Sequence, residues 1–198
     1  QQSMGLPEKE DAFLIGMVSR LTDQKGFDLV AYVMEEMLST MNVQFVVLGT
    51  GEYRFEEMFH YFQSKYPDKI SSYIGYSENV AHQIYASCDA FLMPSLFEPC
   101  GLSQMMSMRY GTLPIVRETG GLKDTVEPYN EYENKGTGFS FAAYNAHDML
   151  HVIRYANYVF SNQKEQWHKI MKRAMEKDFS WNASARKYEE LYDKLILQ

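Results

Sequence analysis

The stretch 91–104, FLMPSLFEPCGLSQ, has the residues best suited to chemistry, and it carries one carboxylate, at Glu98. Gly101 allows a tight backbone turn into a helix that we expect to begin near Leu102. Glu98 therefore follows the carboxyl end of a predicted strand and precedes a helix, which is where open α/β sheets bind ligands. Its neighbours in the sequence are apolar: Leu96, Phe97 and Pro99. Because such neighbours would desolvate an idle carboxylate at some cost, we expect Glu98 to have a function.

A second stretch, 19–26 (SRLTDQKG), places the cations Arg20 and Lys25 just after the apolar run 13–18 and just before a predicted helix. A helix N-terminus offers free N–H groups and a positive dipole end, arginine can hold phosphate oxygens in pairs, and lysine adds a point charge. This combination predicts an anion site. The alternative is two ordinary surface cations.

Glycines at 49 and 51 follow another apolar run and suggest a dinucleotide fingerprint, but the third glycine position holds Arg54. Arginine does not allow the close helix packing that glycine provides there. We therefore expect a structural turn, with a secondary possibility that its backbone lines a nucleotide pocket. The missing fingerprint argues against an oxidoreductase, and the sequence has no Gly-Lys-Ser/Thr phosphate loop of a triphosphatase.

Tyr76 follows the predicted strand 70–74, and an aromatic ring in that position can stack on a nucleobase. The alternative is that it is one of many core or surface aromatics. Further along, Thr119, Gly120 and Gly121 open a short helix whose N–H groups could receive a phosphate. Glu118 would oppose that binding, so we expect its side chain to point away.

The positions predicted for these residues depend on strands and helices that alternate along the chain. Apolar runs predict strands at 13–18, 44–48, 70–74, 90–93, 113–116 and 138–141, and helical spacing predicts helices at 27–41, 52–65, 78–87 and 102–110. This alternation indicates an α/β, Rossmann-like parallel sheet with helices on both faces.

The order of these elements indicates a single domain. We expect a linker at 1–11, the alternating core at about 12–144, and helices at about 145–198, with helical patterns to 158, at 163–177 and at about 182–197. The last helix has a large apolar face formed by Ala185, Tyr188, Leu191, Tyr192 and Leu195. Either that face packs on its own domain or part of it lacks its partner.

Composition bounds the function further. The 198 residues are 45% hydrophobic and 23% charged, which is enough for a sizeable core. The net charge of −7 gives no support for a nucleic-acid partner. No apolar run could span a bilayer, the start lacks a signal-peptide pattern, and two cysteines form no disulfide framework, so we expect a cytoplasmic protein.

Metal chemistry has little support in the sequence. His147 and His151 lie one helical turn apart but have no further ligands in pattern, so we interpret them as polar-face residues. There is no Asp-x-Asp motif to hold a divalent ion on a diphosphate. We expect neither a metal nor a cofactor.

Several blocks in order resemble the donor-binding core of bacterial glycogen synthases and plant starch synthases: 19–26, 95–104 (SLFEPCGLSQ), 109–112 (RYGT) and 119–122 (TGGL). The resemblance covers most of the chain. It implies the C-terminal half of a GT-B type retaining glycosyltransferase, without the N-terminal acceptor domain. It also implies that the last helix crosses back to that other domain.

By this resemblance, Arg20 and Lys25 bind the diphosphate of a sugar nucleotide and stabilise it as a leaving group, and Tyr76 stacks on adenine. Glu98 binds hydroxyls of the donor glucose. The backbone of four residues binds sugar and phosphate oxygens, namely Cys100, Gly101, Leu102 and Ser103. Thr119, Gly120 and Gly121 receive the distal phosphate. Related two-glutamate enzymes have a second glutamate where this chain has Met106, a difference that fits the glycogen and starch synthase branch.

The implied reaction transfers glucose from ADP-glucose to the non-reducing end of an α-1,4-glucan with retention. The implied partners are ADP-glucose or ADP, the glucan and the N-terminal domain of the same enzyme, and the isolated chain is expected to be inactive. Two alternatives stay open: a non-catalytic nucleotide- or glucan-binding module, and another retaining GT-B glycosyltransferase that uses UDP-glucose. A stacked tyrosine tolerates either base, so ADP and UDP are not separated on physical grounds.

Overall fold

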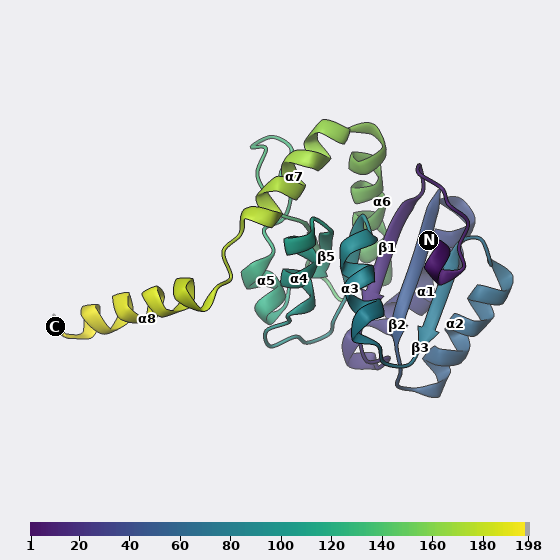
Figure 1. Ribbon diagram of the computed structural model, residues 1–198, viewed down its shortest axis with the longest axis horizontal. Helices are drawn as coiled ribbons and strands as arrows, with labels where there is room; N and C mark the ends of the chain where they lie inside the picture. Colours follow the sequence, from purple (N-terminus) through teal and green to yellow (C-terminus); the bar gives the residue numbers. More distant parts are fainter. Residues whose placement is uncertain (197–198) are drawn as a thin grey trace.

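A computed structural model describes residues 1–196 and contains one parallel sheet of six strands in the order β3-β2-β1-β4-β5-β6 (Figure 1). The strands are β1 (Phe13–Val18), β2 (Val43–Gly49), β3 (Ile70–Ile74), β4 (Ala90–Met93), β5 (Leu113–Arg117) and β6 (Phe139–Phe141). Every neighbouring pair is parallel. The predicted Rossmann-like α/β fold is confirmed, with strand limits within one residue of those predicted.

Helices connect the strands in the predicted order. They are α1 (Phe27–Thr40), α2 (Tyr53–Lys65), α3 (Glu78–Ser87), α4 (Ser103–Tyr110), α5 (Gly120–Thr125), α6 (Ala146–Asn162), α7 (Lys164–Glu176) and α8 (Trp181–Ile196). Two 3₁₀ turns precede β1 and α1, at Gln2–Met4 and Asp23–Lys25. The predicted end of the last helix, at Leu197, lies outside the described residues. Within residues 1–196, no helix combines the length and the apolar character needed to cross a membrane.

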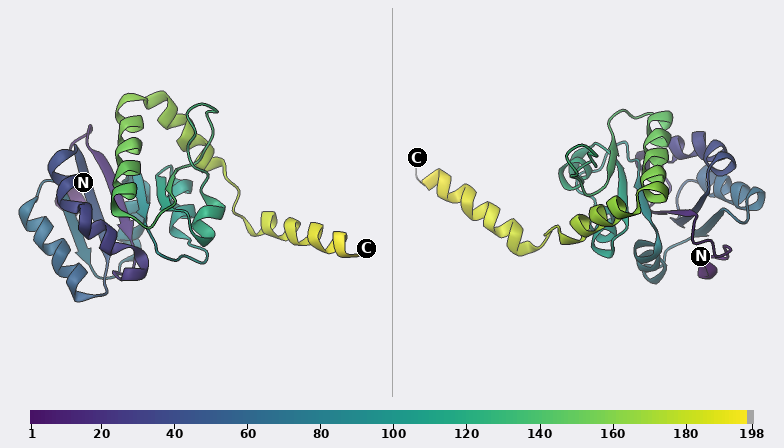
Figure 2. Two further views of the ribbon diagram at one scale, coloured as in Figure 1. Left: turned by 180° about the vertical axis from the view of Figure 1, so that it is seen from behind. Right: turned by 90° about the horizontal axis from the view of Figure 1, so that it is seen from above.

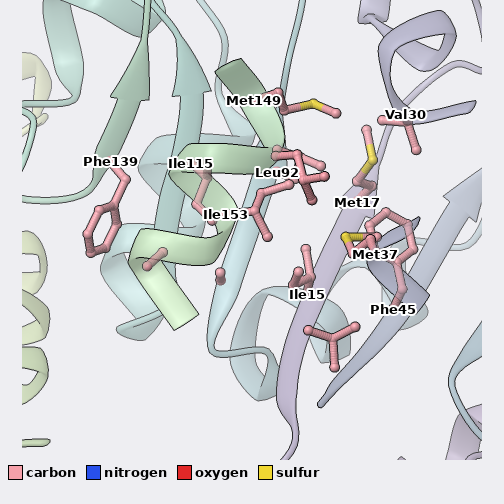
Figure 3. Close-up of a cluster of buried hydrophobic side chains, with 14 of the residues drawn as sticks. Ile15, Met17, Val30, Met37, Phe45, Leu92, Ile115, Phe139, Met149 and Ile153 are labelled. Carbon is pink, nitrogen blue, oxygen red and sulfur yellow. The ribbon is translucent and has the colours of Figure 1, made fainter. Parts of the chain in front are cut away.

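Side chains of the central strands alternate between two apolar layers, as the period of a strand requires. Phe13, Ile15 and Met17 of β1 belong to the larger cluster, whereas Leu14 belongs to the smaller one on the other face. Figure 3 shows the larger cluster, in which residues of β1, β2, β4, β5 and β6 meet α1 and α6. The smaller cluster is covered by α3. Both faces of the sheet are therefore buried, which explains the continuous apolar runs of its strands.

The first eleven residues, expected to be a linker, lie against the sheet. Leu6 is only 3% exposed and joins the smaller core cluster. The Ser71 hydroxyl on β3 donates to Met4 O at 2.6 Å, and Gln44 Nε2 donates to Pro7 O at 2.9 Å. This segment is thus fixed to β2 and β3 by a buried leucine and by side-chain hydrogen bonds.

The last described helix, α8, has no buried residue and extends away from the sheet in both views of Figure 2. Its apolar face is open to solvent, with Trp181 90% and Leu195 61% exposed. Of the two predicted arrangements, the structure shows the one in which this face is not covered by its own domain.

Candidate functional site

The strand order places the two loops of interest side by side. β1 is hydrogen-bonded to both β2 and β4, so the chain leaves β1 toward one edge of the sheet and leaves β4 toward the other. This reversal is the topological switch point at which doubly wound sheets bind ligands. Residues 19–26 follow β1 and residues 94–102 follow β4, both at carboxyl ends of strands.

The two loops are joined by hydrogen bonds across the switch point. Leu96 N–H donates to Gln24 O at 2.9 Å, and Gln24 Nε2 donates to Phe97 O at 3.3 Å. Gly26 has a φ of +78°, and a Cβ there would collide with the Pro94 carbonyl. A glycine is therefore needed for this close approach, and the loops hold each other in place.

Lys25 and Glu98 form an ion pair at this junction, with 2.6 Å between Lys25 Nζ and Glu98 Oε2. Their side chains are 17% and 10% exposed, and the Ser95 hydroxyl donates to the same carboxylate oxygen at 3.4 Å. The pair is thus largely removed from water. Its charge–charge attraction is therefore stronger than that of a pair exposed to solvent. One predicted cation and the predicted carboxylate have come together from loops 73 residues apart.

The burial of Glu98 has a different cause from the one that the sequence suggested. Leu96 and Phe97 are 47% and 55% exposed, so they do not enclose the carboxylate. Glu98 is 8% exposed because the loop after β1 packs over it and supplies Lys25.

Arg20 and Tyr76 lie apart from this pair and line one pocket of about 230 Å³, together with Gly49 and Thr50. The Tyr76 side chain is 84% exposed, and its hydroxyl donates to Glu78 Oε2 at 2.8 Å. That hydrogen bond raises the pKa of Tyr76. Within residues 1–196, Arg20 forms no ion pair, so its charge has no counterion in the described part of the protein.

The turn after β2 is occupied by a carboxylate of the protein. Glu56 Oε1 accepts hydrogen bonds from Gly51 N–H at 2.9 Å and from the Thr50 hydroxyl at 2.7 Å. These bonds lower the pKa of Glu56, the Gly51 N–H most of all. Because the turn already binds a carboxylate of the protein itself, the structural role predicted for its glycines is favoured over an anion-binding role. The backbone at Gly49 also lines the pocket.

The segment from Cys100 to Ser103 turns the chain into α4, as predicted. Gly101 has a φ of +72°, Leu102 is the N-cap residue and Ser103 begins the helix. Cys100 is exposed and its thiol donates to Gly101 O at 3.5 Å, while the Ser103 hydroxyl accepts from the Tyr85 hydroxyl at 3.2 Å.

Thr119, Gly120 and Gly121 lie beside the Glu98 loop. Gly121 N–H donates to Glu98 O at 3.1 Å and to Pro99 O at 3.2 Å, so this amide already has partners within the protein. The Glu118 carboxylate accepts from the Ser140 hydroxyl at 2.7 Å and is thereby held toward β6. The structure thus brings this turn to the backbone of Glu98, whereas Arg20 and Tyr76 form a separate group around the pocket.

Four residues at this junction were not identified from the sequence: Gln24, Ser95, Gln104 and Thr125. Gln104 is 0% exposed, four residues before the buried Met108 on the same helix face. Gln104 could have been identified from the sequence as a polar residue on a predicted buried helix face, because a buried polar side chain needs hydrogen-bond partners. Gln24 had no comparable sequence signal, because its partner, Phe97 O, lies in a distant loop. Ser95 had none either, although its partner, the Glu98 carboxylate, is only three residues away.

Two other features lie outside the Lys25–Glu98 pair and the pocket beside Arg20. A hollow of about 750 Å³ lies between α4 and the end of α7, and its walls are mainly apolar, including Leu102, Met106 and Met175. It contains none of the charged residues singled out above. In the described part of the chain, no three His, Cys, Asp or Glu side chains gather to hold a metal, and His147 and His151 are exposed.

Comparisons with known proteins agree with this geometry. The family model for glycosyl transferases group 1 matches residues 2–177. The chain is 67% identical over 195 residues to a glycogen synthase of Lachnospira eligens, covering 98% of this chain and 41% of that protein. It is 56% identical over 196 residues to a glycogen synthase of Geobacillus stearothermophilus, covering 99% and 40%.

A solved structure is also similar over the whole chain. The catalytic domain of starch synthase IV from Arabidopsis thaliana, bound to ADP and acarbose, matches with a TM-score of 0.86 and 33% identity. The match covers 100% of this chain and 41% of that one. The chain thus spans about two fifths of the length of its relatives, and it corresponds to their C-terminal part.

Proposed function

The chain belongs to the group 1 glycosyltransferases, and on this premise we propose that it is the donor-binding domain of a glycogen synthase that uses ADP-glucose. In the whole enzyme, glucose would pass to the non-reducing end of an α-1,4-glucan with retention of configuration. The Lys25–Glu98 pair at the switch point carries this proposal. It places a cation suited to a diphosphate next to a carboxylate suited to a sugar.

Each charge has a distinct task in the proposed reaction. Departure of ADP leaves negative charge on the diphosphate, and Arg20 and Lys25 would stabilise it in place of a metal ion. Glu98 would bind glucose hydroxyls and face the positive charge that develops at the reacting carbon. Lys25 would then exchange part of its contact with Glu98 for contact with a phosphate oxygen.

The pocket beside Arg20 would take the base. It is lined mainly by apolar and backbone groups, and the exposed Tyr76 ring at its edge offers a stacking surface. The similar starch synthase IV domain has ADP bound, which supports adenine as the base. UDP would fit the same stacking surface, so a comparison of the two nucleotides tests this assignment.

The rest of the enzyme would lie in the part of the relatives that this chain does not cover. Transfer requires donor and acceptor to be held together in near-attack geometry, which a GT-B cleft builds from two domains. The isolated chain should therefore bind the donor without transferring glucose, and its partners would be the N-terminal domain and the glucan.

Calorimetric titration of the chain with ADP, UDP and ADP-glucose tests the proposal. We expect ADP to bind more tightly than UDP, and Arg20→Ala to weaken both. Lys65→Ala is a matched control, because it removes a cation from the far end of α2, where Lys65 pairs with Glu35 at 2.8 Å. The proposal would be wrong if neither nucleotide bound, or if Arg20→Ala and Lys65→Ala had equal effects.

A further inference from the structure

Gln104, in the first turn of α4, is a polar side chain with no exposure to solvent. Its Nε2 donates to Cys100 O at 3.1 Å, to Gly101 O at 2.9 Å and to Thr125 Oγ1 at 3.1 Å. These three acceptors share the two N–H groups of Nε2, whereas Oε1 has no hydrogen-bond partner in the described part of the chain. Acceptors gathered on the nitrogen side alone set the orientation of the amide. The two carbonyls belong to the loop that carries Glu98, so Gln104 holds this loop from beneath.

Thr125, the last residue of α5, extends the connection. Its hydroxyl donates to Gly121 O at 2.6 Å, and Gly121 N–H donates to Glu98 O and Pro99 O at 3.1 and 3.2 Å. The hydrogen bonds thus form a closed circuit from Glu98 through Gly121, Thr125 and Gln104 to Cys100. This circuit fixes the backbone of Glu98 without using Lys25.

Glycines make the circuit possible. A Cβ at Gly120 would collide with Glu98 O, and a Cβ at Gly121 would collide with Cys100 O. Gly101 and Gly120 also have positive φ values of +72° and +43°. The loop and the start of α5 therefore pack backbone to backbone. This packing fixes the position of the Glu98 backbone from which the side chain extends.

We propose that Gln104 and Thr125 are positioning residues that set the Glu98 carboxylate and the Cys100–Gly101 backbone for the sugar half of the donor. This inference rests on the proposed function. The pocket assigned to the base is lined by residues 18–20, 48–50, 75–77 and 81, none of which belongs to the circuit. Disturbing the circuit should therefore weaken recognition of the sugar much more than recognition of the nucleotide.

Two near-isosteric variants of this chain test the inference: Thr125→Val and Gln104→Met. By calorimetry, each should weaken ADP-glucose binding about tenfold and change ADP binding less than about threefold, as expected for loss of buried hydrogen bonds. Thr125→Ser, which keeps the hydroxyl, should restore wild-type affinity. Thr112→Val is the matched control, because the buried Thr112 hydroxyl donates to Tyr85 O and Cys88 O at 2.6 and 2.7 Å, outside the circuit.

A second readout does not depend on any ligand. Gly121 N–H should exchange with solvent faster in Thr125→Val than in wild type or Thr112→Val, because its acceptors on the Glu98 loop are less firmly held. If Gln104→Met does not fold, Thr125→Val decides alone.

Several results would overturn the inference. If wild type binds ADP but both variants keep the wild-type affinity for ADP-glucose, the circuit has no positioning role. Equal loss of ADP and ADP-glucose binding, or an equal effect of Thr112→Val, would show a merely structural role. If wild type binds neither ligand, the proposed function fails and the inference fails with it.

Discussion

Glu98→Gln is the most informative single substitution at the switch point. Glutamine keeps the size of the side chain and can still accept a hydrogen bond from Lys25, but it removes the negative charge. Lys25 Nζ lies 2.6 Å from Glu98 Oε2, and both side chains are largely shielded from solvent. A hydrogen bond between charged groups contributes about 1.5–3 kcal/mol. Because Glu98 and a diphosphate would both bind the Lys25 ammonium group, part of this free energy opposes binding of the diphosphate.

The substitution should therefore affect nucleotide binding and turnover in opposite directions. If about 0.7 kcal/mol of competition is relieved, the Kd for ADP falls about threefold. In the complete enzyme, loss of a charge that stabilises an oxocarbenium-like transition state should lower the rate of transfer by about 10² or more.

Calorimetry on the chain and a glucosyl-transfer assay on the complete enzyme measure the two effects. Glu118→Gln is the control, because that carboxylate is held by the Ser140 hydroxyl at 2.7 Å and should affect neither. Near-normal turnover in Glu98→Gln would make Glu98 a structural carboxylate. A collapse of ADP binding would show that Glu98 shapes the pocket, and either result would exclude the proposed role in the transition state.

Three further predictions follow from the same structure. Arg20→Ala and Lys25→Ala should each weaken ADP binding by about 1.5–3 kcal/mol in calorimetry, and added salt should weaken the wild-type complex; unchanged affinity in both folded variants would remove them from the site. Burial raises the pKa of Asp89 to about 6, so its contribution to stability falls as the pH rises from about 4 to about 6. In urea denaturation, the free energy of unfolding of Asp89→Asn should therefore rise by about 1–2 kcal/mol relative to that of wild type as the pH is raised from 5 to 7. Identical pH profiles of the two proteins would contradict this. The purified chain should incorporate no glucose into glycogen above background with saturating ADP-glucose, and robust elongation would refute the proposed division of labour.

The sheet was predictable because its strands are buried on both faces. Runs such as 13–18 and 90–93 are continuously apolar, and turn residues separate them from amphipathic helices. These patterns also placed Lys25 and Glu98 at carboxyl ends of strands. The position of each loop could therefore be predicted from local sequence alone.

The contacts between loops were not predictable in the same way. Lys25 and Glu98 are 73 residues apart, and nothing in either loop shows that the two side chains meet. The apolar neighbours Leu96 and Phe97 suggested the burial of Glu98 correctly but for the wrong reason, since both residues are themselves about half exposed.

The contacts of the two terminal segments were also not predictable from local sequence. Leu6 and Met4 are apolar side chains in an otherwise polar stretch, and the burial of Leu6 depends on the smaller core cluster, which no local pattern reveals. The apolar face of α8 was evident from its spacing, but spacing does not identify what the face packs on.

Reconstitution of transfer from two separate parts of the enzyme would show whether this chain is the donor-binding half. The chain would be co-expressed with the N-terminal part of the Lachnospira eligens glycogen synthase that it does not cover, and incorporation of labelled glucose from ADP-glucose into glycogen would be measured. We expect the two parts together to transfer glucose, neither part to do so alone, and Glu98→Gln to abolish most of the restored activity. Folded parts that associate and bind ADP but transfer no glucose would contradict it.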